Sequence, residues 1–69
     1  MPEVVINGES HRLPAGANVT DAVSASGAPA DGRGVAVAVD GEVVARAAWS
    51  TTQLSPGARV EVLQAVQGG

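Results

Sequence analysis

Residues 35–44 read VAVAVDGEVV, a strand pattern that runs directly into a turn pair. Over 35–39 valine alternates with alanine, which is the period-two pattern of a strand with two unlike faces. Asp40-Gly41 follows directly, and such a pair between two strand-like runs is a strong signal of a two-residue hairpin turn, because both residues tolerate positive φ. The chain then returns through 42–44. The stretch therefore predicts an antiparallel hairpin.

A second hairpin is predicted at the start of the chain. The β-branched run at 4–6 stops at Asn7-Gly8, a pair that favours a type I′ turn. We expect the return strand to run from about Ser10 to Leu13, where the following Pro14 ends it.

Between the two hairpins the spacing predicts a short helix. Asn18 is a suitable N-cap, and Asp21 places a carboxylate in the first turn. One helical face carries the residues spaced i, i+3, i+4 and i+7, namely Val19, Ala22, Val23 and Ser26. Gly27 suits the position after the helix and Pro29 prevents its continuation. A helix this short is expected to be stabilised by docking onto a sheet.

The remaining chain completes an α+β layout. From 45 to 57 the periodicity breaks, so we expect an irregular crossover anchored by Trp49, Leu54 and Pro56. A last strand is expected from about Arg59 to Ala65. The order β-β-α-β-β-β predicts one helix packed across a mixed sheet. No linker interrupts it, so residues 1–65 are expected to form one domain, followed by a tail at 66–69.

Composition excludes several classes of function. The 69 residues include no Cys and one His, which leaves no disulfide framework, thiolate metal site or Cys nucleophile. The net charge of −3, with four Arg and no Lys, argues against a nucleic-acid partner. No apolar run approaches the roughly 20 residues of a membrane span, and no basic-then-apolar leader opens the chain. We therefore expect a soluble cytoplasmic protein that binds no metal or cofactor and carries no catalytic site of its own.

The sequence closes on Val66-Gln67-Gly68-Gly69, which allows two interpretations. The glycines are either an inert end of the chain or a reactive tail. Without Cβ atoms, a Gly-Gly tail can thread a narrow channel and present its carboxylate in a partner's active site. Because a carboxylate is a poor electrophile, it would need adenylation by ATP, which gives a mixed anhydride that a sulfur or amine nucleophile can attack.

Three stretches resemble the ThiS family of thiamine-biosynthesis sulfur carriers, which are ubiquitin-like β-grasp proteins. They are VVINGE at 4–9, VAVDGEVVAR at 37–46 followed by Trp49, and VEVLQAVQGG at 60–69. The resemblance covers nearly the whole chain. It departs from the family pattern at Asp40, where Asn is more usual, at Ala45, where Pro is common, and at 47–48, where alanines replace polar residues.

The resemblance implies a role for the tail. The carboxylate of Gly69 would be adenylated by a ubiquitin-activating-like adenylyltransferase that uses ATP. It would then be converted to a thiocarboxylate with sulfur from a donor such as a cysteine desulfurase. Thiazole synthase would accept that sulfur, and Gly68 would keep the tail thin. The chain would be a protein co-substrate of these partners and not an enzyme.

Three other functions remain open on the sequence. The small subunit of molybdopterin synthase shares the fold and the Gly-Gly tail, but its members tend to be longer and richer in aromatic residues. A ubiquitin-like protein modifier is a second alternative, although a chain without Lys cannot build Lys-linked polymers of itself. The third is a β-grasp interaction module whose tail is inert.

One face of the sheet is a candidate docking surface. If Val37, Val39, Val60 and Val62 face the helix, the opposite face presents Ala36, Ala38, Leu63 and Ala65. This is either an ordinary surface of a small domain or an apolar surface beside the tail that binds a partner. We expect it to dock the activating enzyme.

Overall fold

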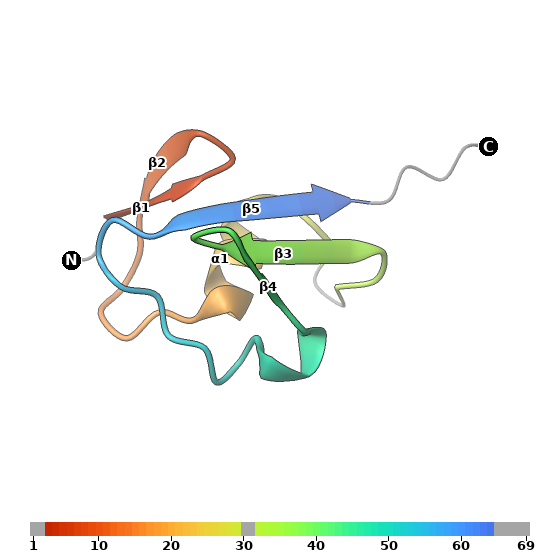
Figure 1. Ribbon diagram of the computed structural model, residues 1–69. Coiled ribbons are helices and arrows are strands. Elements are labelled where there is room, and N and C mark those ends of the chain that lie inside the picture. Colours follow the sequence, from red (N-terminus) through yellow and green to blue (C-terminus); the bar gives the residue numbers. More distant parts are fainter. Residues whose placement is uncertain (1–2, 30–31, 65–69) are drawn as a thin grey trace.

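The protein folds into two layers, a five-stranded sheet and a helix that covers one of its faces (Figure 1). A computed structural model describes residues 3–29 and 32–64. The strands are β1 (Glu3–Ile6), β2 (Glu9–Arg12), β3 (Val35–Val39), β4 (Glu42–Val44) and β5 (Arg59–Gln64), and the helices are α1 (Val19–Ala25) and the 3₁₀ turn η1 (Arg46–Ala48). The predicted order β-β-α-β-β-β is confirmed.

Both predicted hairpins form with two-residue turns. Asn7 and Gly8 have φ of 50° and 84°, and Asp40 and Gly41 have φ of 49° and 85°, as a type I′ turn requires. The first return strand begins one residue earlier than predicted, because a two-residue turn pairs Ile6 directly with Glu9.

Strand β5 lies in the middle of the sheet, whose order is β2-β1-β5-β3-β4. It runs parallel to β1, with Ile6 opposite Val60, and antiparallel to β3, from Val39 opposite Val60 to Val35 opposite Gln64. The first and last strands are therefore neighbours, and the sheet is mixed as predicted.

Helix α1 begins with a reciprocal capping box. The side chain of Asn18 accepts the N–H of Asp21 at 3.0 Å, and the Asp21 carboxylate accepts the N–H of Asn18 at 2.9 Å. Because the two side chains satisfy each other's backbone donors, the helix start is well defined. Gly27, with φ of 84°, follows the C-cap Ser26 as predicted.

The crossover between β4 and β5 is more regular than predicted, since it opens with η1. Trp49 follows η1, is 6% exposed and donates its indole N–H to the Val44 carbonyl at 3.0 Å. Further on, the N–H of Val19 binds the Thr52 carbonyl at 3.0 Å and the N–H of Leu54 binds the Ala17 carbonyl at 2.9 Å. These bonds attach the crossover to the start of α1.

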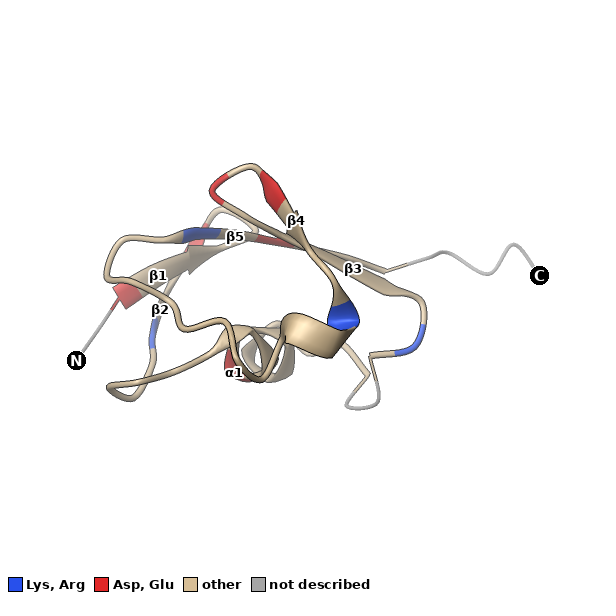
Figure 2. Ribbon diagram, turned by 60° about the horizontal axis from the view of Figure 1, so that its bottom comes forward, with Lys and Arg blue, Asp and Glu red and all other residues tan. Residues whose placement is uncertain are grey.

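Small and β-branched side chains fill the space between the layers, and Figure 2 shows the sheet with α1 and η1 on one side of it. The core consists of Val4, Ile6, Leu13, Ala17, Val19, Ala22, Val23, Val37, Trp49, Leu54, Ala58, Val60 and Val62. Three of the four valines expected to face the helix are buried there. Val39 is half-buried and packs against the core from the turn end of β3.

Candidate functional site

The candidate site lies at the end of β5, where the sequence continues into the tail. Gln64 is the last described residue, and it lies opposite Val35 at the start of β3. Ala65, Val66, Gln67, Gly68 and Gly69 lie outside the described residues. Their predicted roles in carrying sulfur and forming a tail therefore stay predictions.

Strand β5 is held on both sides almost to its last described residue. On one side β3 pairs with it from Val60 to Gln64. On the other side β1 pairs with its first half, through the N–H of Val5 to the Ala58 carbonyl and the N–H of Asn7 to the Val60 carbonyl, both 2.9 Å. A central strand bonded in this way is a rigid base for whatever follows Gln64.

Beyond the end of β1, the side chain of Asn7 makes the hydrogen bonds to β5 that the backbone of β1 makes before it. The Asn7 Oδ1 accepts the N–H of Val62 at 2.8 Å, and the Asn7 Nδ2 donates to the Val62 carbonyl at 3.1 Å. An amide presents one donor and one acceptor, as a peptide unit does, so it continues the ladder for one more residue. The sequence predicted Asn7 only as a turn residue, and no spacing in the sequence signals its partner 55 positions away.

Asp40 makes a related contact from the other hairpin. Its Oδ1 accepts the N–H of Arg59 at 3.0 Å, while its own N–H binds the Arg59 carbonyl at 2.8 Å. Only an acceptor is needed at this position, and both Asp and Asn supply one. The departure from the family pattern at Asp40 is therefore compatible with the same local structure.

The outer face of the sheet holds the predicted docking residues that are described. Ala36 lies directly opposite Leu63, which is 64% exposed, and Ala38 is half-buried nearby on the same face. Ala65, predicted with them, lies outside the described residues. Val43, which was not predicted from the sequence, pairs with Ala38 from the edge strand β4 and is 81% exposed.

This face is not the smooth apolar surface expected from the sequence. Glu61 lies opposite Ala38, exposed, on the same face as Leu63. Side chains two residues apart on a strand share a face, so a carboxylate between the apolar residues follows from the register of β5. We call Ala36, Ala38, Val43, Glu61 and Leu63 the outer patch.

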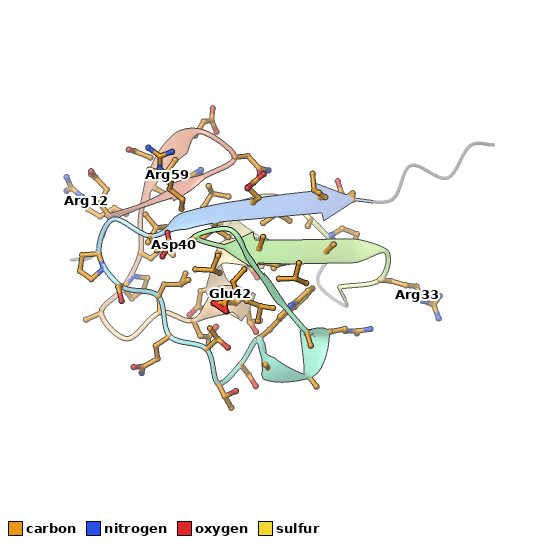
Figure 3. The ribbon with its side chains drawn as sticks, viewed as in Figure 1. Arg12, Arg33, Asp40, Glu42 and Arg59 are labelled. Atoms are coloured by element: carbon orange, nitrogen blue, oxygen red, sulfur yellow. The ribbon has the colours of Figure 1, made fainter. Side chains whose placement is uncertain are left out.

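Charged residues lie at both ends of β3. Asp40, Glu42 and Arg59 are at its turn end, whereas Arg33 precedes its other end, beside the end of β5 (Figure 3). The side chain of Arg46 lies near Gly32, since a Cβ on this glycine would be 3.3 Å from the Arg46 Nε.

Across residues 3–29 and 32–64, no group of three or more His, Cys, Asp and Glu side chains could hold a metal ion. An open groove of about 560 Å³ runs beside the first hairpin turn and is lined by Val5, Asn7, Gly8, Arg59, Val60 and Glu61.

In the described part of the chain, none of the helices has the length and apolar character needed to cross a membrane.

Known proteins place the chain in one family. The ThiS family model matches residues 4–69. The crystal structure of the thiamine biosynthesis protein ThiS from Geobacter metallireducens is 32% identical, with a TM-score of 0.72 over 97% of this chain and 99% of that one. The NMR solution structure of a thiamine biosynthesis protein from the same organism is 30% identical, with a TM-score of 0.74 over 97% of this chain and 87% of that one. No curated protein matches the chain. The likeness confirms the β-grasp fold, and the chain belongs to the ThiS family.

Proposed function

We propose that this protein is a sulfur carrier that supplies sulfur for thiazole formation in thiamine biosynthesis. The observation that carries the proposal is the match to the ThiS family over residues 4–69, which includes the terminal Gly68-Gly69. The similar structures from Geobacter metallireducens are of proteins of thiamine biosynthesis, which supports the same pathway.

The proposed chemistry takes place at the Gly69 carboxylate in two steps. A carboxylate oxygen attacks the α-phosphorus of ATP, and pyrophosphate leaves, which gives an acyl-adenylate. A sulfide equivalent from the sulfur donor then attacks the carbonyl carbon, and AMP leaves with the original oxygen. The product is a thiocarboxylate in which sulfur replaces one oxygen, and thiazole synthase takes this sulfur. ATP is bound and used by the adenylyltransferase, so the carrier needs no cofactor of its own.

The hydrogen bonds that hold β5 on both sides support this role. Because β3, β1 and Asn7 together hold the strand through Val62, the tail starts from a defined point on the domain.

The outer patch is the surface that we propose to dock the adenylyltransferase. Leu63 and Val43 are the two large hydrophobic side chains exposed among the described residues, and both belong to it. Exposed apolar side chains grouped on one face typically mark an interaction surface. Because Glu61 lies within the patch, the matching surface of the partner should be apolar with a basic group opposite this carboxylate.

The proposal can be tested by ATP–pyrophosphate exchange, an assay of adenylation, with a ubiquitin-activating-like adenylyltransferase of thiamine biosynthesis. We expect exchange that depends on the wild-type carrier and is lost when Gly69 is deleted. Exchange that persists after the deletion would show that the reaction does not require Gly69 and would overturn its proposed role, whereas no exchange with the wild-type chain would favour an interaction module with an inert tail. Adenylation followed by isopeptide bonds to other proteins would identify a modifier instead, and sulfur transfer to a molybdopterin precursor would identify the synthase subunit.

A further inference from the structure

Asn7-Gly8 is the only Asn-Gly pair in the sequence, and this dipeptide is chemically reactive as well as suited to a turn. Because glycine has no Cβ, its backbone nitrogen can approach the side-chain carbonyl carbon of the preceding asparagine without steric hindrance. The other asparagine, Asn18, precedes Val19, whose β-branched side chain hinders the same approach. Fast deamidation is therefore expected at Asn7 and not at Asn18.

Deamidation at this pair consumes only water. The Gly8 nitrogen attacks the Asn7 Cγ, its proton passes to the departing Nδ2 group, and ammonia leaves, which gives a cyclic succinimide. Water then opens the ring at one of its two carbonyls, to give aspartate with the ordinary main chain or isoaspartate with the main chain routed through Cγ. Either product adds one negative charge to the net charge of −3. Asn7 and Gly8 are both exposed, so water reaches the turn.

The folded protein holds the reacting group of Asn7 against β5. Its Oδ1 accepts the N–H of Val62 at 2.8 Å, and its Nδ2 donates to the Val62 carbonyl at 3.1 Å. Attack requires the Asn7 Cγ to rotate back toward the Gly8 nitrogen, and this rotation breaks both hydrogen bonds. The turn itself is also constrained, since Ile6 pairs directly with Glu9 across it. The reactive geometry is therefore reached only when the turn opens away from β5.

We infer that Asn7 is a deamidation site that its contact with Val62 keeps unreactive in the folded protein. The inference does not depend on the proposed function, because it concerns the described hairpin and strand alone. It predicts that the reaction proceeds from locally or globally unfolded chains, and that its rate follows the population of those states.

The products cannot restore the contact. Aspartate at position 7 keeps an acceptor for the Val62 N–H, but a carboxylate oxygen replaces the Nδ2 donor and faces the Val62 carbonyl. Two acceptors then lie together without a proton between them, which is unfavourable. Isoaspartate adds one carbon to the main chain of a two-residue turn and so alters its geometry. Modification therefore loosens the first hairpin from the strand that leads to the tail.

Peptide mapping by mass spectrometry tests the protection. The full chain is incubated in native buffer and in urea that unfolds it, at the same temperature and pH. We expect Asn7 to deamidate in urea while Asn18, the control within the same molecule, stays largely intact. In native buffer we expect the Asn7 rate to be at least about tenfold lower than in urea. Equal Asn7 rates in the two conditions would overturn the inference, as would an Asn7 that is stable in both.

A substitution tests the consequence of the modification. Asn7→Asp is the aspartate product made directly, and Ser55→Asp is the control, because it adds the same charge at an exposed residue outside the hairpin. We expect the equilibrium constant for unfolding, measured by urea denaturation, to rise about tenfold for Asn7→Asp and to stay within about twofold of the wild type for Ser55→Asp. Equal stability of the two variants would show that the contact with Val62 does not need the amide, and would overturn the inference.

Discussion

The side-chain amide of Asn7 binds the backbone of Val62 with two hydrogen bonds, of 2.8 Å from the Val62 N–H and 3.1 Å to the Val62 carbonyl. Asn7 thus has two structural roles. Its φ of 50° forms the first hairpin turn, and its side chain connects that turn to the last strand. The start of the chain is in this way attached to the strand that leads to Gly69.

Removal of this contact should weaken the fold measurably. Asn7→Gly keeps the tolerance for positive φ and deletes both hydrogen bonds, which leaves the Val62 groups without their partner. We expect the free energy of unfolding to fall by about 1–3 kcal/mol, measured by urea denaturation followed by circular dichroism. A fall of less than about 0.5 kcal/mol would show that the amide adds little to the hairpin and β5.

Asp40 allows a matched comparison with Asn7, because its side chain makes one hydrogen bond to β5 whereas that of Asn7 makes two. Asp40→Gly loses the acceptor for the Arg59 N–H and should cost about 0.5–1.5 kcal/mol, less than the Asn7 substitution. Asp40→Asn keeps an acceptor and the tolerance for positive φ, so its stability should stay close to the wild type. If Asp40→Asn were as destabilising as Asp40→Gly, the charge of Asp40 would matter and the acceptor would not.

Gly32 lies against Trp49 and should not tolerate a side chain. A Cβ at Gly32 would lie 2.6 Å from the Cζ3 of Trp49, and its φ is 69°. Gly16 is the control, because its φ is 81° but nothing lies within 4 Å of its Cβ position. Both Ala variants carry backbone strain, and we expect Gly32→Ala to be less stable than Gly16→Ala by about 1–3 kcal/mol. Trp49 is the one aromatic residue, so its fluorescence reports the change at the contact, and equal stabilities would contradict the close packing.

Leu63 tests the outer patch as a docking surface. Leu63→Asp places a charge among the exposed apolar residues and should raise the KM of adenylation about tenfold or more, with stability within about 0.5 kcal/mol of the wild type. Thr20→Asp is the control, because it adds the same charge to the exposed side of α1 on the other layer. Unchanged adenylation kinetics for Leu63→Asp would rule out the patch as the docking site.

Local signals were sufficient to predict most of the fold. Asn7-Gly8 and Asp40-Gly41 specify hairpin turns because few other pairs adopt positive φ at both positions, and the Asn18 cap with Gly27 bounds the helix. These features depend on neighbours in the sequence. The alternation of valine in β3 and β5 likewise predicted the buried face of these strands, with Val39 only half-buried.

Features that depend on distant partners could not be predicted in this way. The side chain of Asn7 meets Val62 only after β1 and β5 pair, and the carboxylate of Asp40 meets Arg59 only after β3 and β5 pair. Glu61 interrupts the outer patch because the register places it opposite Ala38. Val43 was missed because its strand contributes only three residues, too few for alternation to assign its face.

The mass of the carrier after reaction tests the central claim most directly. The protein is incubated with the adenylyltransferase, ATP and a sulfur donor, and its intact mass is measured. Because oxidation of Met1 or Trp49 gives nearly the same gain as the exchange of oxygen for sulfur, the gain must be located by fragmentation and trapped with a thiol alkylator. We expect the gain at Gly69, and we expect it to vanish when Gly69 is deleted. No gain, with partners that are active on another carrier, would contradict the assignment of this protein as a sulfur carrier.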